Sequence, residues 1–103
     1  MDFRLSLSRA DNGMHFNLIE CNSGLKMSVQ GSDFSYSQPR IAGLDGYWYT
    51  EFEIGFPTVK IDKIMKYAED TDAPTDTVYG YVPYELIQEV INDNGGLISG
   101  EST

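Results

Sequence analysis

Several residue types are scarce in this 103-residue chain, which has one cysteine and one histidine. A single cysteine cannot form a disulfide framework, and one of each cannot build a Cys/His zinc cluster within the chain. Basic residues are also few, because seven Lys and Arg stand against 16 Asp and Glu, for a net charge of −9. Binding to nucleic-acid phosphates or to anionic lipid needs a basic surface. We therefore expect neither direct nucleic-acid binding nor membrane attachment.

Long apolar runs are missing as well, and none approaches the roughly 20 residues of a membrane-spanning helix. Residues 1–6 lack the basic start and apolar stretch of a secretory signal. The lone Cys21 fits a reducing compartment. Hydrophobic residues make up 41% of the chain, which is enough for one core. We expect a single compact domain over residues 1–103, located in the cytoplasm (of a bacterial host cell if phage-encoded).

Alternation of apolar and polar residues predicts that residues 1–56 are mainly strands. Three strands are expected at 3–8, 14–18 and 25–30, separated by Asn-Gly and Asn-Ser-Gly turn signals. A shorter one is expected at 34–37, where Pro39 ends it or restricts it to a sheet edge. The strongest strand is expected over 47–56. Its predicted core face carries Trp48, Thr50, Phe52, Ile54 and Phe56, and its other face carries Tyr47, Tyr49, Glu51 and Glu53.

Residues 57–98 change to a helix–strand–helix pattern. Helical spacing of apolar residues predicts a first helix from Thr58 to about Asp70, and a strand follows at 77–82. A second helix should begin at Pro83 and stop at 94–96, with 97–98 folding back and 99–103 frayed. The pattern predicts an α+β fold: an antiparallel sheet of four or five strands, with an N-terminal β-meander and two C-terminal helices packed on one face. The predicted core residues are Trp48, Phe52, Ile54, Ile61, Ile64, Leu86 and Val90.

The charge is unevenly distributed along the sequence. Residues 1–40 are neutral overall, residues 41–103 carry the whole net charge, and no basic residue follows Lys66. Such asymmetry favours an acidic surface that binds a basic partner, although a merely solubilising face is the alternative. Tyrosines accompany these acids and suit protein interfaces. The residues expected to contact a partner are Tyr47, Tyr49, Glu51, Glu53, Asp70, Asp72, Asp76, Tyr79, Tyr81, Glu85, Glu89 and Asp93.

Catalytic and metal sites are not expected. His15 and Cys21 lie six residues apart on one predicted strand, about 20 Å, so they cannot form a catalytic dyad. The segment 70–72 begins like a calcium loop, but Thr75 stands where such a loop needs glycine. We expect no cofactor and no catalytic residue. If the helices leave one sheet face open, Tyr47 and Tyr49 could instead form a homodimer contact.

In overall character, a small acidic α+β chain without a catalytic motif, the sequence resembles small phage-encoded inhibitors of bacterial defence of the anti-CRISPR type. That resemblance implies a non-catalytic protein that occludes a larger target, here a basic groove of a nucleic-acid-binding effector. The run 48–54 leading into a helix also resembles toxin-immunity proteins, which would imply masking of a toxin active site. A small accessory enzyme or metal-dependent hydrolase is a further alternative.

Overall fold

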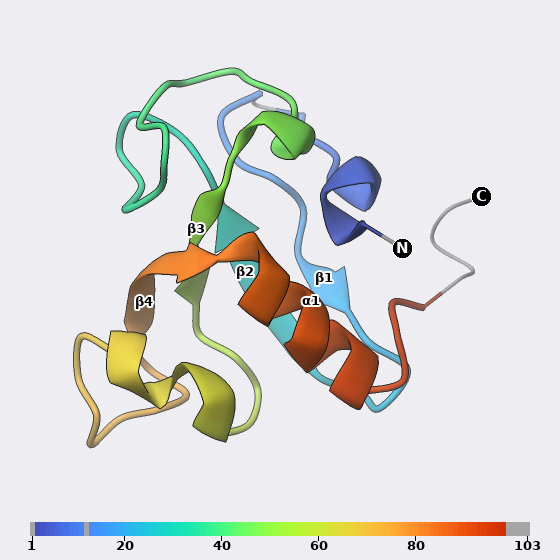
Figure 1. Ribbon diagram of the computed structural model, residues 1–103, viewed down its shortest axis with the longest axis vertical. Helices are drawn as coiled ribbons and strands as arrows, with labels where there is room; N and C mark the ends of the chain where they lie inside the picture. The colour runs from blue at the N-terminus through green and yellow to red at the C-terminus, as the bar shows by residue number, and fades with distance from the viewer. Residues whose placement is uncertain (1, 12, 99–103) are drawn as a thin grey trace.

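A four-stranded antiparallel sheet forms the centre of the computed structural model, which describes residues 2–11 and 13–98. The strands are β1 (Ile19–Glu20), β2 (Lys26–Gln30), β3 (Glu51–Gly55) and β4 (Val78–Pro83), and they lie side by side in sequence order. One α-helix, α1 (Tyr84–Asp93), lies across one face of this sheet (Figure 1). The expected antiparallel sheet and a C-terminal helix are therefore confirmed, within an α+β architecture, whereas the expected N-terminal meander keeps only its third strand, 25–30.

The core lies where α1 meets the sheet. Val29 of β2 pairs with Ile54 of β3, and Ile54 pairs with Tyr79 of β4. Ile87 and Val90 are buried on the inner side of α1, as the helical spacing of its apolar residues requires. Phe52, Ile54, Ile61, Ile64 and Val90 were predicted as core residues and are buried. Leu86 is only half-buried, because Ile87 takes the position that faces the sheet.

The N-terminal segment differs from the expected strand at 3–8, because Phe3–Ser6 form a 3₁₀ turn, η1. The Asp2 carboxylate accepts a hydrogen bond from the Arg4 backbone N–H, which closes this turn. Phe3 then points inward, with its ring centroid 5.6 Å from that of Phe52. The expected strand at 14–18 is also wrong, because this segment contributes only an isolated bridge between Arg9 and Phe16.

The expected long strand at 47–56 begins only at Glu51, because Gly46–Trp48 form a 3₁₀ turn, η2. This turn breaks the alternation, so Trp48 is 64% exposed whereas Tyr49 is fully buried. A side chain at Gly46 would bring its Cβ within 2.8 Å of the Arg4 carbonyl oxygen, so glycine is what lets η2 pack on η1. Phe56 is exposed and adopts a φ of 50° just after β3 ends.

The first expected helix, from Thr58 to Asp70, is a short 3₁₀ segment, η3 (Asp62–Tyr67). Thr58 does not cap a helix, because its N–H and its Oγ1 bond the Lys26 carbonyl and N–H at the start of β2. At the other end Ala68 forms a bridge with Tyr79, which draws the chain into line with β4. Tertiary pairing at both ends therefore shortens the helix. The expected strand at 34–37 is likewise absent, although Gln38 bridges Glu51.

The C-terminal part of the described chain follows the sequence closely. Gly95 and Gly96 adopt φ values of 82° and 81° after α1, a conformation that favours glycine at a helix end. Leu97 then bridges Cys21, and the Ile98 N–H donates to the Glu20 carbonyl, so this segment folds back along β1. The fraying expected at 99–103 lies outside the described residues. None of the helices in the described part of the chain has the length and apolar character needed to span a membrane.

Candidate functional site

Exposed aromatic and aliphatic side chains gather around η2. Trp48 is 64% exposed, Leu5 of η1 is 71% exposed, and Tyr47 is about half exposed. Leu5, Tyr47 and Trp48 line one shallow pocket together with Arg4 and Asp45, among others. We call Leu5, Tyr47, Trp48 and the adjoining Tyr84 the Trp48 surface. A contiguous apolar patch of this kind marks interaction sites in soluble proteins.

A buried arginine holds the Trp48 surface in place. The Arg4 guanidinium lies 3.6 Å from the Tyr84 ring centroid and 4.6 Å from that of Tyr47. It also donates to the carbonyl oxygens of Tyr47 and Tyr49 and forms a 2.7 Å ion pair with Asp2. The Arg4 hydrogen bond lowers the pKa of Asp2 below its usual value. These contacts join η1, η2 and α1, so the surface is organised before any partner binds.

The edges of the Trp48 surface are acidic. Asp45 immediately precedes η2, and Glu85 lies in the first turn of α1 beside Tyr84 and Asp2. Both carboxylates are exposed, and none of the ion pairs found among the described residues involves either of them. The expectation that Tyr47 and Glu85 lie on an accessible surface therefore holds.

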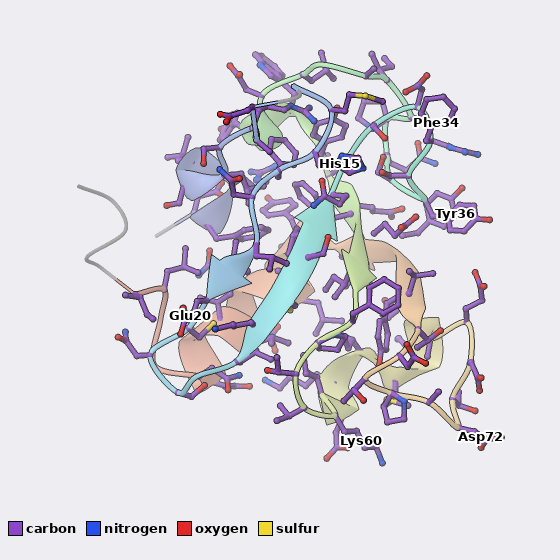
Figure 2. The ribbon with its side chains drawn as sticks, turned by 180° about the vertical axis from the view of Figure 1, so that it is seen from behind. His15, Glu20, Phe34, Tyr36, Lys60 and Asp72 are labelled. Carbon is purple, nitrogen blue, oxygen red and sulfur yellow. The ribbon has the colours of Figure 1, made fainter. Side chains whose placement is uncertain are left out.

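A second acidic region is the loop 69–77, which carries Asp70, Asp72 and Asp76 on the surface. We call it the acidic loop, and it lies at the opposite end of the molecule from η2 (Figure 1). Figure 2 places Asp72 at its outer edge. The loop is held to β4, since the Asp70 N–H donates to the Thr77 hydroxyl oxygen and the Tyr79 hydroxyl donates to the Pro74 carbonyl.

The acidic face of α1 is partly neutralised by a lysine. Lys63 of η3 forms ion pairs with Glu89 at 3.1 Å and with Asp93 at 2.8 Å. These two carboxylates raise the pKa of Lys63. The sequence interpretation had treated Glu85, Glu89 and Asp93 as one uninterrupted acidic stripe. That interpretation is corrected, because Lys63 from η3 pairs with the last two of these carboxylates.

The structure corrects the prediction for two of the tyrosines that were expected to contact a partner. Tyr49 and Tyr79 are fully buried, so neither can contact a partner in this conformation. Tyr81 is exposed and stacks against Tyr36 with 5.9 Å between ring centroids. Trp48 was expected in the core, but its side chain is more exposed than those of Tyr47 and Tyr81.

Glu51 and Glu53 do not form a free acidic strand face. Both are half-buried. Glu51 bridges Gln38, and Glu53 Oε1 accepts a hydrogen bond from the Tyr36 N–H at 2.9 Å. The segment 36–38 therefore lies against β3 where the sequence interpretation had placed a partner.

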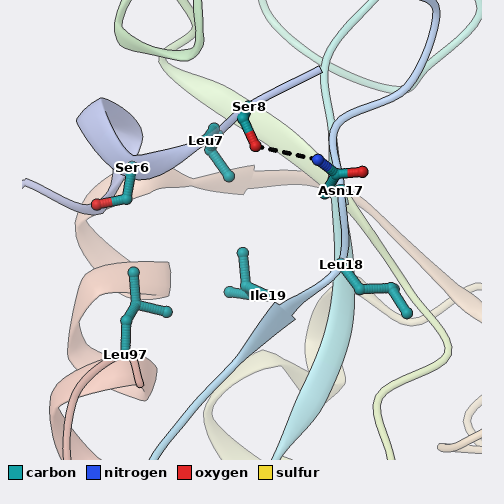
Figure 3. A pocket seen from close by; sticks show the side chains of 7 residues that line it. All are labelled: Ser6, Leu7, Ser8, Asn17, Leu18, Ile19 and Leu97. Carbon is teal, nitrogen blue, oxygen red and sulfur yellow. Dashed lines mark hydrogen bonds between the residues drawn. The ribbon is translucent and has the colours of Figure 1, made fainter. Parts of the chain in front are cut away.

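A small pocket of mixed polar and apolar lining opens where the N-terminal segment separates from β1 (Figure 3). Leu7, Ile19 and Leu97 contribute its apolar walls, and its volume is about 200 Å³. The Asn17 side chain donates to the Ser8 hydroxyl at its rim. The described residues that line it include no titratable side chain.

His15 and Cys21 lie in different environments. His15 is exposed, whereas Cys21 is fully buried next to the chain that follows α1. Among residues 2–11 and 13–98, no three His, Cys, Asp or Glu side chains are placed to ligate one metal ion.

Sequence reasoning missed the exposure of Trp48 and the buried Arg4. The Asp45–Gly46 pair directly before Tyr47 is a turn signal, and it could have indicated that the strand starts later. Arg4 gave no such signal, because a basic residue alternating with apolar ones has the pattern of a solvated strand position. Comparison of the chain with protein-family models, with curated proteins and with solved structures finds no match.

Proposed function

We propose that this protein is a non-catalytic binding protein that docks on a basic surface of a larger protein, with Trp48 as its anchor. The observation that carries the proposal is the exposure of Trp48 beside Leu5 and Tyr47. The buried Arg4 contacts the ring and the carbonyl oxygen of Tyr47 and so stabilises this surface. Tryptophan and tyrosine dominate the binding energy of protein interfaces, because they cover a large area with few rotatable bonds. An indole that is exposed to water contributes little to the stability of the fold, so a binding role explains its exposure better.

Charge supports a basic partner. The protein carries a net charge of −9, and Asp45 and Glu85 flank the Trp48 surface without ion pairs among the described residues. Acidic groups around an apolar centre accelerate association with a basic surface and disfavour acidic competitors. The acidic loop at the far end adds to the same field over a longer distance.

The kind of partner that this charge fits best is a protein with a groove for nucleic acid, such as a nuclease or another effector of bacterial defence. Occluding that groove would make the protein an inhibitor of the anti-CRISPR type. Masking a toxin active site, as an immunity protein does, is the second form of the same activity. Both are inhibition by steric and electrostatic occlusion, and both require no catalytic residue.

The test is affinity capture with three immobilised baits: the wild type, Trp48→Ala and Val59→Ala. Val59 is a matched control, because it is an exposed apolar side chain that is not part of the Trp48 surface. We expect the wild type and the Val59 variant to retain the same basic protein, with retention falling as salt rises. The Trp48 variant should lose it. Equal retention by all three baits, or retention of nucleic acid alone, would refute the proposal.

A further inference from the structure

A second pocket, of about 290 Å³, lies between the turn 13–15 and the loop 32–35. Gln30 and Glu53, which are paired partners on β2 and β3, contribute to its lining. His15 and Phe34 line it from separate segments at the same end of the molecule, as Figure 2 shows. Its volume is at the lower end of that of small-molecule sites, so it suits one side chain better than a large ligand.

The charge inside this pocket is negative. Asp33 and Glu53 both line it, and no ion pair found among the described residues involves either carboxylate. Among the described residues that line it there is no lysine or arginine. Arg40 lies nearby, but its guanidinium donates to the Asp33 backbone carbonyl and lies 5.6 Å from the centroid of the Tyr36 ring.

Several polar groups of the walls other than the Asp33 carboxylate make internal hydrogen bonds. The Gln30 amide bonds both the N–H and the carbonyl of Phe16, at 2.7 and 2.9 Å. The Ser32 and Ser35 hydroxyls bond each other at 2.9 Å, and Glu53 Oε1 accepts from the Tyr36 N–H. The walls are therefore organised in advance, which reduces the entropy lost when a ligand binds.

Phe34 gives the pocket an exposed aromatic wall. Its side chain is 79% exposed, the highest value among the large hydrophobic residues described. It stands on a loop fixed by a hydrogen bond from its own N–H to the Ser32 hydroxyl. An aromatic ring next to two carboxylates is a favourable environment for an organic cation, which gains a cation–π contact together with charge-assisted hydrogen bonds.

We propose that this pocket receives an arginine side chain of the protein partner, with the guanidinium between the Phe34 ring and the carboxylates of Glu53 and Asp33. This inference rests on the proposed function, because it assigns the partner a particular side chain. Arginine fits better than lysine, since a planar guanidinium can stack on a ring and bond a carboxylate through two N–H groups at once. An anionic ligand is disfavoured by the two carboxylates.

The test is a titration of the ¹⁵N-labelled full chain with N-acetylargininamide, followed by amide chemical shifts. We expect shifts confined to 13–15, 30–35, 42–43 and 53. N-acetylcitrullinamide, which has the same shape without charge, should cause none. Glu53→Gln keeps the acceptor for the Tyr36 N–H, and should weaken binding by at least about tenfold. Phe34→Ala should weaken it by about threefold to tenfold. Asp72→Asn removes an equal charge from the acidic loop and should change nothing.

Shifts centred on the Trp48 surface, or equal responses to the charged and neutral probes, would overturn the inference. So would a Glu53→Gln variant that binds the probe as the wild type does. Capture of the partner by Glu53→Gln but not by Trp48→Ala would refute the arginine pocket and leave the proposed function standing. Probe binding in the pocket, combined with full capture by Trp48→Ala, would support the pocket and refute Trp48 as the anchor.

Discussion

Replacing Tyr49 by alanine should strongly destabilise the protein, whereas the same replacement of its neighbour Trp48 should leave its stability almost unchanged. Tyr49 is fully buried, and its ring contacts those of Phe16 and Phe52 at centroid distances of 6.2 and 5.7 Å. Its hydroxyl donates to the Ile41 carbonyl and so holds the preceding loop. Trp48 projects into solvent from the same backbone turn.

The expected magnitude follows from the area that each ring removes from water. A buried aromatic side chain covers roughly 200 Å². At about 25 cal/mol per Å² the whole side chain contributes about 5 kcal/mol. Since alanine retains its methyl group, Tyr49→Ala should lower the free energy of unfolding by about 3–5 kcal/mol. Tyr49→Phe loses only the hydroxyl contacts and should cost about 1 kcal/mol. Trp48→Ala should stay within about 0.5 kcal/mol of wild type.

Urea denaturation followed by far-ultraviolet circular dichroism measures these differences without depending on the tryptophan signal. A loss of 3–5 kcal/mol leaves little stability in a domain of this size, so the Tyr49→Ala variant should be partly unfolded even without denaturant. If Trp48→Ala destabilised the protein as much as Tyr49→Ala, η2 would not exist as described.

Three further predictions concern stability. Ile64→Ala should cost about 2–5 kcal/mol in urea denaturation, because Ile64 is the fully buried side chain of η3, and a wild-type midpoint would mean that η3 does not pack on the sheet. Gly31→Ala should cost about 1–3 kcal/mol, since its Cβ would lie 2.7 Å from the Tyr49 ring, and an unchanged melting temperature would contradict that contact. Asp2→Asn should lower stability near neutral pH, because Arg4 lowers the pKa of Asp2, so that the linked stability is complete above the usual Asp range and is lost as the pH falls toward the lowered pKa. Urea midpoints of wild type and Asp2→Asn should therefore converge as the pH falls through that lowered pKa, and a gap that persists in strong acid would contradict the linkage.

Elements with a strong and continuous pattern were predictable from the sequence. The alternation in 25–30 and 77–82 corresponds to β2 and β4, and the apolar stripe starting at Leu86 corresponds to α1. The double glycine marked the end of α1 correctly. In each case local propensity and the burial requirement point to the same structure, so no tertiary contact needs to override the pattern.

The remaining elements depend on contacts that no local pattern reveals. Alternation at 3–8 yields to a turn because Asp2 bonds the backbone and side chain of Arg4, whose guanidinium reaches the carbonyls of η2. The helix expected from Thr58 is shortened because Thr58 pairs with Lys26, 32 residues earlier. Both are long-range or side-chain effects that compete with propensity.

Prediction of the candidate site was limited in the same way, by contacts that the local sequence pattern does not reveal. Tyr47, Tyr81 and Glu85 were placed correctly at the surface. Strand alternation beginning at 47 rather than 51 assigned Trp48 and Tyr49 to the wrong sides. The alternation within β3 itself is correct, since Phe52 and Ile54 are buried, and the error is confined to the residues that η2 takes out of the strand.

The most direct test of the binding account uses the fact that Trp48 is the only tryptophan in the chain. Incorporation of 5-fluorotryptophan gives a single ¹⁹F signal, whose shift between H₂O and D₂O reports solvent exposure of this side chain. We predict a solvent-exposed signal in the free protein, and a displaced, solvent-shielded signal when the captured basic partner is added. A signal that is shielded from the start, or one that stays exposed in the complex, would contradict the claim that Trp48 anchors the partner.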